Sequence, residues 1–192
     1  ENKLDVAECW GDRAEVLFHG LAGSVEFYDA EENSPNIFDQ ALTRALPRET
    51  RARIKRIERL DEIAFDPLRR RESVLLREND GAYRLLVRGA PEALIQNNEQ
   101  QKENLLAWAR EQGRKGRRVL AVAEKTLVAR PERPLAPEDE DDLTVVGLIS
   151  FANPLKPGAR RALQSAERLG VRVKILTGDS KEVAGEVAHE AG

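Results

Sequence analysis

Residues 73–87, with the sequence SVLLRENDGAYRLLV, decide the expected fold. Two short apolar runs, at 73–76 and 83–87, lie on either side of the polar tetrapeptide 78–81. Apolar runs separated by an Asp-Gly dipeptide are typical of two antiparallel strands joined by a tight turn. We therefore predict a β-hairpin here, as part of an antiparallel sheet.

A helical pattern precedes the hairpin. Ser34 and Pro35 predict a helix start, because serine caps helix N-termini and proline is favoured in the first turn. Apolar residues then recur at spacings of one, three and four, which indicates a helix that ends before Pro47. These apolar positions are Ile37, Phe38, Ala41, Leu42 and Ala45. The basic stretch 48–59 continues either as a helix or as an exposed connection.

Further elements follow the hairpin. Residues 91–95 predict a short helix, residues 99–111 a longer one, and residues 118–126 a buried strand. The stretch 129–142 carries three prolines and a run of acids. This composition indicates a surface loop or a domain boundary.

Beyond residue 142 the pattern changes to that of a parallel sheet. The expected elements are a strand at 143–151, a helix at 157–169, a strand at 171–176 and a last helix opened by a capping box of Asp179 and Glu182. Such alternation of strand and helix starts a doubly wound sheet. The predicted fold class is therefore α/β (α+β): an antiparallel sheet with flanking helices, followed by a partial Rossmann-like parallel βαβα segment.

Composition excludes several classes of protein. With 192 residues, 41% of them hydrophobic and 34% charged, the chain fits one ordinary soluble domain or two small ones. Its longest nearly apolar run, 145–152, is less than half of the ~18 residues that a membrane span needs, and the polar start at Glu1 does not predict a signal peptide. One cysteine excludes an internal disulfide framework, two histidines argue against a zinc site, and a net charge of -3 argues against a protein built mainly to hold nucleic acid. Because the sequence contains no methionine, we expect it to be an excised or processed piece of something larger.

The sharpest local motif is residues 174–180, KILTGDS, at the end of an expected buried strand. In open parallel sheets, ligands bind beyond the carboxyl ends of strands, and helix N-termini offer unpaired N–H groups to anions. The Thr177 hydroxyl and the Gly178 amide therefore suit a phosphoryl group. The alternative is an ordinary strand-to-helix turn capped by Asp179.

A second motif, residues 65–74, places an aromatic ring before three arginines and a strand. Phe65 would stack on a base while the guanidinium groups meet phosphates. The alternative is a core phenylalanine followed by a solvated basic turn.

A third motif, residues 87–92, runs from a strand through a tight turn into a helix. Gly89 allows a ligand to approach the backbone closely, and Arg88 supplies a positive charge. The alternative is an ordinary β-to-α connection.

In this order, these segments resemble the cytoplasmic part of P-type cation-transporting ATPases. The matching stretches are 60–74 with the adenine-stacking phenylalanine, 88–92 with Lys-Gly-Ala-Pro-Glu, 153–156 with the hinge motif Asp-Pro-Pro-Arg/Lys, and 177–179 with Thr-Gly-Asp. The resemblance covers almost the whole chain and is weakest in the first thirty-odd residues. The amino-acid sequence of residues 61–71 and 173–176 is most similar to that of the bacterial magnesium-importing branch.

The resemblance implies roles for individual residues. Phe65 would stack on adenine, Asp39 would contact the nucleotide, and Arg70 would lie near the phosphates or ribose. The nucleotide site would be completed by Arg88, which lines the adenine pocket, by the neighbouring Gly89, and by Arg118, which contacts the phosphates. The group that positions the phosphoryl group and its magnesium would be Thr177, Gly178 and Asp179. The hinge would be Asn153, Pro154 and Lys156.

Three departures from the family pattern limit what is implied. Arg88 replaces lysine, which keeps the charge but changes the donor geometry, and Asn153 replaces the hinge aspartate. The Asp-Lys-Thr-Gly-Thr segment with the phosphorylated aspartate is absent. No catalytic residue and no metal ligand is therefore assigned, and we expect this chain alone to bind ATP without turning it over.

The resemblance also implies an organisation and a setting. Residues 1–142 would form the nucleotide-binding domain and residues 143–192 part of the phosphorylation (HAD-like) domain, on the cytoplasmic face of the cell membrane. ATP and Mg²⁺ would be the cofactors, and the other cytoplasmic and transmembrane domains of the same polypeptide the partners. An aspartyl-phosphate would drive cation transport, with Mg²⁺ as the cation and Ca²⁺ or a proton as the alternatives.

Two rival functions and one assembly state stay open. A soluble HAD-like phosphatase would need an Asp-x-Asp nucleophile segment after an early strand, where the chain has none, and a nucleic-acid module is disfavoured by the acids at 138–142. If the parallel segment does not fold without its missing strands, we expect the fragment to self-associate through residues 143–192.

Overall fold

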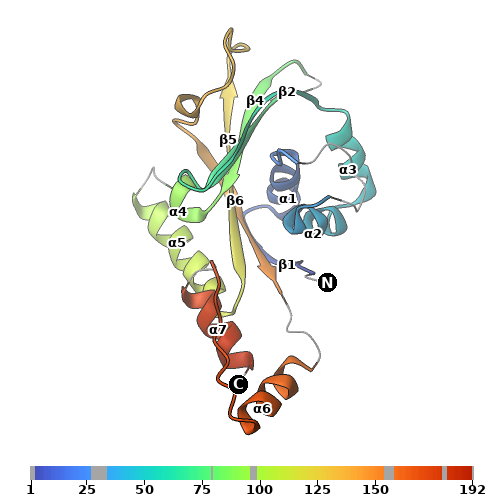
Figure 1. The fold of residues 1–192 in the computed structure, drawn as a ribbon. Coiled ribbons are helices and arrows are strands. Elements are labelled where there is room, and N and C mark those ends of the chain that lie inside the picture. Colours follow the sequence, from blue (N-terminus) through green and yellow to red (C-terminus); the bar gives the residue numbers. More distant parts are fainter. Residues whose placement is uncertain are drawn as a thin grey trace.

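The computed structural model describes residues 3–26, 34–78, 80–95, 99–153, 158–178 and 181–191. Among these residues, six strands form one sheet (Figure 1). In sheet order the strands are β1 (Asp5–Trp10), β6 (Thr144–Ala152), β5 (Arg118–Leu127), β4 (Tyr83–Gly89), β3 (Arg71–Arg77) and β2 (Glu58–Asp66). All neighbours pair antiparallel, so the predicted antiparallel sheet is confirmed.

Helices cover both faces of this sheet. One face packs against α1 (Arg13–Ala22), α2 (Ile37–Ala45) and α3 (Arg48–Lys55), and the other against α4 (Pro91–Leu94) and α5 (Glu99–Arg114). Beyond one end of the sheet lie α6 (Ala159–Arg168) and α7 (Lys181–Ala191), with α7 against α5 (Figure 1). No helix within the described ranges is long and apolar enough to cross a membrane.

Strand alternation divides the core into two clusters. In β4, Leu86 packs in the cluster under α1–α3, whereas Leu85 and Val87 pack in the cluster under α4 and α5. Successive side chains of a strand point to opposite faces. Arg88 therefore points toward the α1–α3 face, a direction that decides the geometry of the site described below.

The predicted hairpin is present as β3 and β4. At the turn, the Glu78 N–H donates to the Ala82 carbonyl at 2.9 Å, and the Gly81 N–H donates to the Glu78 carbonyl at 2.9 Å. Gly81 has φ +88°, the left-handed region that glycine adopts without strain. Asn79 lies outside the described residues.

The start of α2 lies two residues after the predicted one. Asn36 is the N-cap, because its side chain accepts the Phe38 N–H at 2.9 Å. The Ser34 hydroxyl instead accepts the Asn36 N–H at 3.2 Å and orients the cap. The basic stretch that follows begins with helix α3 and ends in the start of β2.

The first two elements, β1 and α1, have no counterpart among the predictions. Asp12 caps α1 by accepting the N–H groups of Ala14 and Glu15, each at 3.0 Å. Every residue of α1 from Val16 to Ala22 is buried. A helix that is buried on all sides lacks the amphipathic periodicity by which a surface helix is predicted from sequence. This is why α1 was not predicted.

The parallel arrangement predicted for residues 143–151 is wrong. These residues form β6, but β6 pairs antiparallel with β1 and β5. Its apolar character comes from the helices on both faces of the sheet. Helices α6 and α7 occur where predicted, yet residues 171–178 between them form no strand, and Val171, Val173 and Ile175 are about half exposed. The Rossmann-like segment is therefore not confirmed, and its capping residue Asp179 lies outside the described residues.

At Gly147 the backbones of β6 and β1 leave no room for a side chain. A Cβ there would lie 2.2 Å from the Trp10 carbonyl oxygen and 2.5 Å from the Val16 Cγ2 atom. We expect Gly147→Ala to lower the free energy of unfolding by overpacking, on the order of 1–3 kcal/mol, as measured by urea unfolding.

Gly185→Ala in α7 is the matched control for this substitution. Its new Cβ would meet nothing within 4 Å, and alanine favours a helix over glycine, so stability should stay the same or rise slightly. If Gly147→Ala were as stable as the unmodified chain, β1 would not approach β6 as closely as described.

Candidate functional site

Arg88 lies at the centre of a buried polar cluster between the sheet and helices α1 and α2. Its side chain is 3% exposed and forms ion pairs with Asp39 on α2 and Glu72 on β3. The guanidinium also donates to the Gly20 carbonyl at 3.0 Å and to the Ser24 hydroxyl at 2.8 Å. The structure thus brings together two predicted site residues, Asp39 and Arg88, from distant parts of the sequence.

The charges of this cluster are unequal, since two carboxylates surround one guanidinium. Burial alone would lower the pKa of Arg88, but the carboxylates of Asp39 and Glu72 outweigh it and raise that pKa, so the guanidinium stays charged. Burial raises the pKa of Glu72, the pairing with Arg88 opposes this, and the negative charges of Asp39 and Glu26 add to the rise. The net effect is a pKa of Glu72 above its ordinary value.

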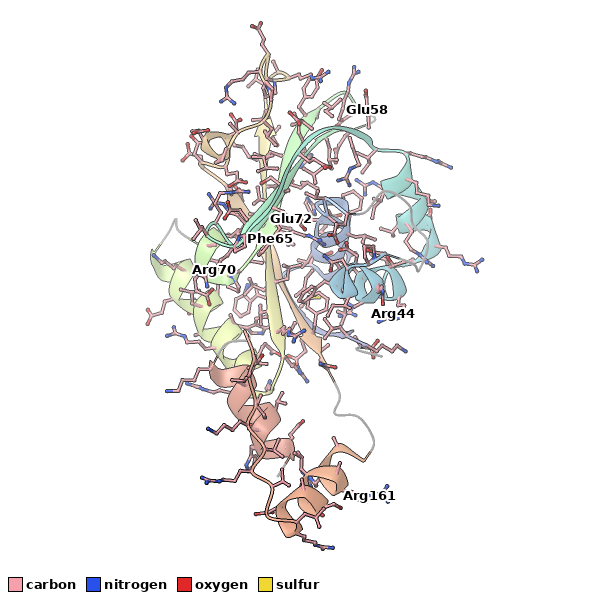
Figure 2. All side chains as sticks on the ribbon, viewed as in Figure 1. Arg44, Glu58, Phe65, Arg70, Glu72 and Arg161 are labelled. Carbon is pink, nitrogen blue, oxygen red and sulfur yellow. The ribbon has the colours of Figure 1, made fainter. Side chains whose placement is uncertain are left out.

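Phe65 and Arg70 lie at the end of the β2–β3 pair, close in sequence to Glu72 (Figure 2). The Phe65 side chain is 57% exposed, so it is not the core phenylalanine of the alternative interpretation. Arg70 has φ +54°, a left-handed conformation that is uncommon for a residue with a side chain. Its guanidinium is 52% exposed and lies 3.4 Å from the Glu92 carboxylate. An aromatic ring and a cation thus face outward together.

The two other arginines of this turn do not face outward. Arg69 and Arg71 form ion pairs with Glu140 at 2.6 Å and 2.5 Å, and the Ser73 hydroxyl donates to the same carboxylate. Two of the three arginines are thus paired within the chain, and the expected contact of the arginine run with phosphates stays a prediction. The carboxylate of Glu140 holds the first and the third arginine, and Arg70 alone of the three stays largely exposed.

The predicted close approach of a ligand to Gly89 is untested, and the group that approaches Gly89 in the structure is the chain itself. A Cβ at Gly89 would lie 2.4 Å from the Arg70 carbonyl oxygen and 2.6 Å from the Arg71 Cβ. The next residue, Ala90, donates its N–H to the Arg70 carbonyl at 2.9 Å. Gly89 thereby fixes the turn that carries Arg70, and its contact with a nucleotide stays a prediction.

Arg118 begins β5, where it lies opposite Phe151 of β6. Gly89, the last residue of β4, lies opposite Ala121, three residues further along β5. Arg118 is therefore about 10 Å beyond the end of β4, at about 3.3 Å per strand residue, and on the same face as Val122 and Arg88. Its contact with phosphates stays a prediction.

The predicted phosphoryl-positioning and hinge residues lie outside this cluster. Thr177 and Gly178 are exposed in the segment between α6 and α7. These two helices lie in the lower half of Figure 1, whereas β2 lies in its upper half. Asn153 directly follows β6 and is exposed. The remaining predicted residues, Asp179, Pro154 and Lys156, lie outside the described residues. Over the ranges that the structure describes, no cluster of three or more His, Cys, Asp or Glu residues is placed to hold a metal ion.

Sequence reasoning missed three members of the site: Ser24, Glu72 and Glu140. A signal for Glu72 was present, because a hairpin centred on the Asp-Gly turn places Glu72 directly opposite Arg88, and opposite charges at such positions attract. Glu140 gave no local signal, since it is one acid among several in a proline-rich loop. Ser24 follows α1, which was itself missed.

Glu72 contributes a pH-dependent term to stability, and its sign follows from its burial. Because its pKa in the folded chain lies above the ordinary value of 4.5, the unfolded chain loses this proton at the lower pH. The stability contributed by the protonated carboxyl is present below that value and is lost as the pH rises toward the folded pKa.

We therefore expect the unmodified chain to lose unfolding free energy relative to Glu72→Gln as the pH rises above 4.5. Urea unfolding at a series of pH values measures it, with Glu92→Gln as a side-chain exchange of the same size at an exposed position. A difference that moves the other way would contradict the raised pKa.

Comparison with known proteins agrees with this geometry. The family of the P-type ATPase cytoplasmic domain N matches residues 24–158, which include Arg88 and its partners Ser24, Asp39 and Glu72. The chain is 36% identical to the Magnesium-transporting ATPase, P-type 1, of Escherichia coli (strain K12) over 206 aligned positions, which cover 100% of the chain and 22% of that protein. It is 37% identical to a protein of the same name from Salmonella typhimurium (strain LT2) over 172 positions, 82% of the chain and 19% of the relative.

A more distant relative is the Calcium-transporting ATPase of Bacillus subtilis (strain 168), 26% identical over 144 positions, which cover 68% of the chain and 16% of that protein. The chain spans about a fifth of the length of the magnesium-transporting relatives that it matches. The family match covers more than half of the chain and includes the hairpin, the buried Arg88 and the outward-facing Phe65. The chain therefore belongs to the family of the P-type ATPase cytoplasmic domain N.

Proposed function

We propose that this chain binds ATP, with Phe65 stacked on the adenine and Arg70 close to the ribose or phosphates. The observation that carries the proposal is the exposed ring of Phe65 at the end of the β2–β3 pair, where the half-exposed guanidinium of Arg70 also lies. Stacking a base on an exposed aromatic ring is energetically favourable, and the apolar ring loses little when it is removed from water. A guanidinium at the same strand end offers charge-assisted hydrogen bonds to an anionic phosphate.

The buried cluster behind this surface suits a supporting role. Asp39 and Arg88 satisfy each other and are almost wholly buried, so neither offers a free group to solvent. We propose that they and Glu72 shape the wall of the adenine pocket as a fixed set of ion pairs. Arg118, on the same face and beyond the end of β4, would then extend the site toward the phosphates.

The chemistry divides between this chain and the rest of a longer polypeptide. ATP bound with Mg²⁺ supplies a γ-phosphoryl group whose charge the metal neutralises during transfer. The residues of this chain hold the base and the sugar, and they orient the phosphates. Because the sequence has no Asp-Lys-Thr-Gly-Thr segment, we propose that the acceptor aspartate comes from another part of that polypeptide.

The proposed role of the larger protein is to couple ATP hydrolysis to the movement of a cation across a membrane, with this chain on the cytoplasmic face. Mg²⁺ is the proposed cation, because the relatives named as magnesium-transporting are 33–37% identical, whereas the calcium-transporting one of Bacillus subtilis shares 26%. Phosphoryl positioning by Thr177, Gly178 and Asp179 belongs to the same proposal.

We propose that the boundary between the nucleotide-binding domain and the phosphorylation domain falls after Ala152. This is further along than the predicted boundary at residue 142, and it is supported by the pairing of β6 within the sheet. Asn153 would then begin the hinge. Self-association of the isolated chain stays a prediction, and the exposed apolar side chains of residues 171–176 support it.

Calorimetric titration with ATP and Mg²⁺ tests the proposed binding. We expect the unmodified chain to bind at about -4 to -6 kcal/mol, the sub-millimolar to millimolar range. Phe65→Ala removes the stacking surface and should weaken binding roughly tenfold or more.

Leu68→Ala is the matched control, because Leu68 is an apolar side chain on the same turn that is 94% exposed. It should bind ATP like the unmodified chain. Equal binding by Phe65→Ala would place the base elsewhere, and a folded, unmodified chain that binds no ATP would overturn the proposal.

A further inference from the structure

Glu140 is a buried carboxylate that a surface loop places against the end of the β2–β3 pair. It follows the short 3₁₀ helix Pro137–Asp139, in the connection between β5 and β6. Its side chain is 0% exposed, whereas Glu138 and Asp141 of the same acidic run are exposed. Burying a carboxylate is unfavourable by several kcal/mol unless it is paired and hydrogen-bonded. Glu140 meets that condition through Arg69, Arg71 and the Ser73 hydroxyl.

Arg69 connects Glu140 to the strand end that carries Phe65. One of its terminal nitrogens donates to Glu140 at 2.6 Å, and the other donates to the carbonyl of Ala64 at 2.9 Å. Ala64 directly precedes Phe65. Asp66, which directly follows Phe65, accepts the Arg69 backbone N–H with its carboxylate at 3.1 Å. Both neighbours of Phe65 are thus held by Arg69.

This link matters because the regular strand pairing is interrupted at the same place. The register of β2 against β3 shifts between Ile63 and Asp66. Ala64 and Phe65 therefore lack the continuous ladder that fixes the rest of β2. The hydrogen bond from the Arg69 side chain to the Ala64 carbonyl replaces it at the position where Phe65 must be aimed.

The same carboxylate also fixes the backbone around Arg70. Arg69 and Arg71, its two neighbours in sequence, are both bound to Glu140. The Arg70 carbonyl accepts the Ala90 N–H at 2.9 Å, while its side chain stays half exposed. Glu140 thus holds the left-handed turn in place and leaves the Arg70 guanidinium directed outward.

We infer that Glu140 is a positioning residue of the nucleotide site, acting through Arg69 on the orientation of Phe65. The inference rests on the proposed stacking of Phe65 on adenine. It makes the connection between β5 and β6 part of the site, although none of its residues needs to touch the nucleotide.

The test is a double-mutant cycle of Glu140→Gln and Phe65→Ala, read by calorimetric titration with ATP and Mg²⁺. We expect Glu140→Gln to weaken ATP binding about fivefold or more, and to have no further effect once Phe65 is replaced. Glu138→Gln is the matched control, since it makes the same exchange at an exposed position two residues away. It should bind ATP like the unmodified chain.

A second pair of variants keeps the inference testable if Glu140→Gln fails to fold, which circular dichroism would show. Arg69→Gln removes the link to Ala64 and leaves the Arg71–Glu140 pair, whereas Arg71→Gln leaves the link intact. We expect Arg69→Gln to weaken ATP binding more than Arg71→Gln does. Binding of inorganic tripolyphosphate, which has no base to stack, should be unchanged in Arg69→Gln.

Three results would overturn the inference. They are ATP binding by folded Glu140→Gln equal to that of the unmodified chain, an equal loss with and without Phe65, and a loss of tripolyphosphate binding in Arg69→Gln. Failure of the proposed function would look different, because Phe65→Ala alone would then bind ATP as well as the unmodified chain does.

Discussion

The ion pairs of buried Arg88 with Asp39 and Glu72 are the interaction on which the rest of the structure depends. They join two adjacent strands to α2, and the bonds to Gly20 and Ser24 add the end of α1. Removing one partner of such a buried pair typically costs about 3–5 kcal/mol, because the charge that remains is uncompensated. The cluster therefore favours the position of α1 and α2 over the sheet at which these ion pairs and hydrogen bonds form.

A second cluster of charges holds the opposite face of the same strand end. Along β3, Arg71 and Ser73 point to Glu140, and Glu72 between them points to Arg88. The alternation of a strand thus divides three consecutive polar residues between two buried networks. The turn before β3 is fixed from both faces, and Phe65 and Arg70 are what remains directed outward. A rigid surface of this kind suits binding better than a loop that must be ordered by its ligand.

Local patterns were sufficient where one segment determines its own structure. The Asp-Gly turn predicted the β3–β4 hairpin, and helical spacing predicted α2, α4 and α5. Local patterns were insufficient where the structure of a segment depends on the strands and helices that it packs against. The apolar run of β6 has the same composition whether its neighbours are parallel or antiparallel, and α1 is buried on all sides, so it shows no period. For the candidate site, the motifs and the family resemblance pointed to Asp39, Phe65, Arg70 and Arg88. The ion pairs of Arg88, Arg69 and Arg71 depend on Glu72 and Glu140, which only the fold brings near.

The most direct test of the account is to map the ATP contact on the chain by nuclear magnetic resonance. Backbone amide shifts of the ¹⁵N-labelled chain would be followed during titration with ATP and Mg²⁺. A site built on the fixed end of the β2–β3 pair predicts that the largest changes fall in residues 64–72 and 88–90. Changes confined to other parts of the chain, with residues 64–72 unmoved, would contradict it.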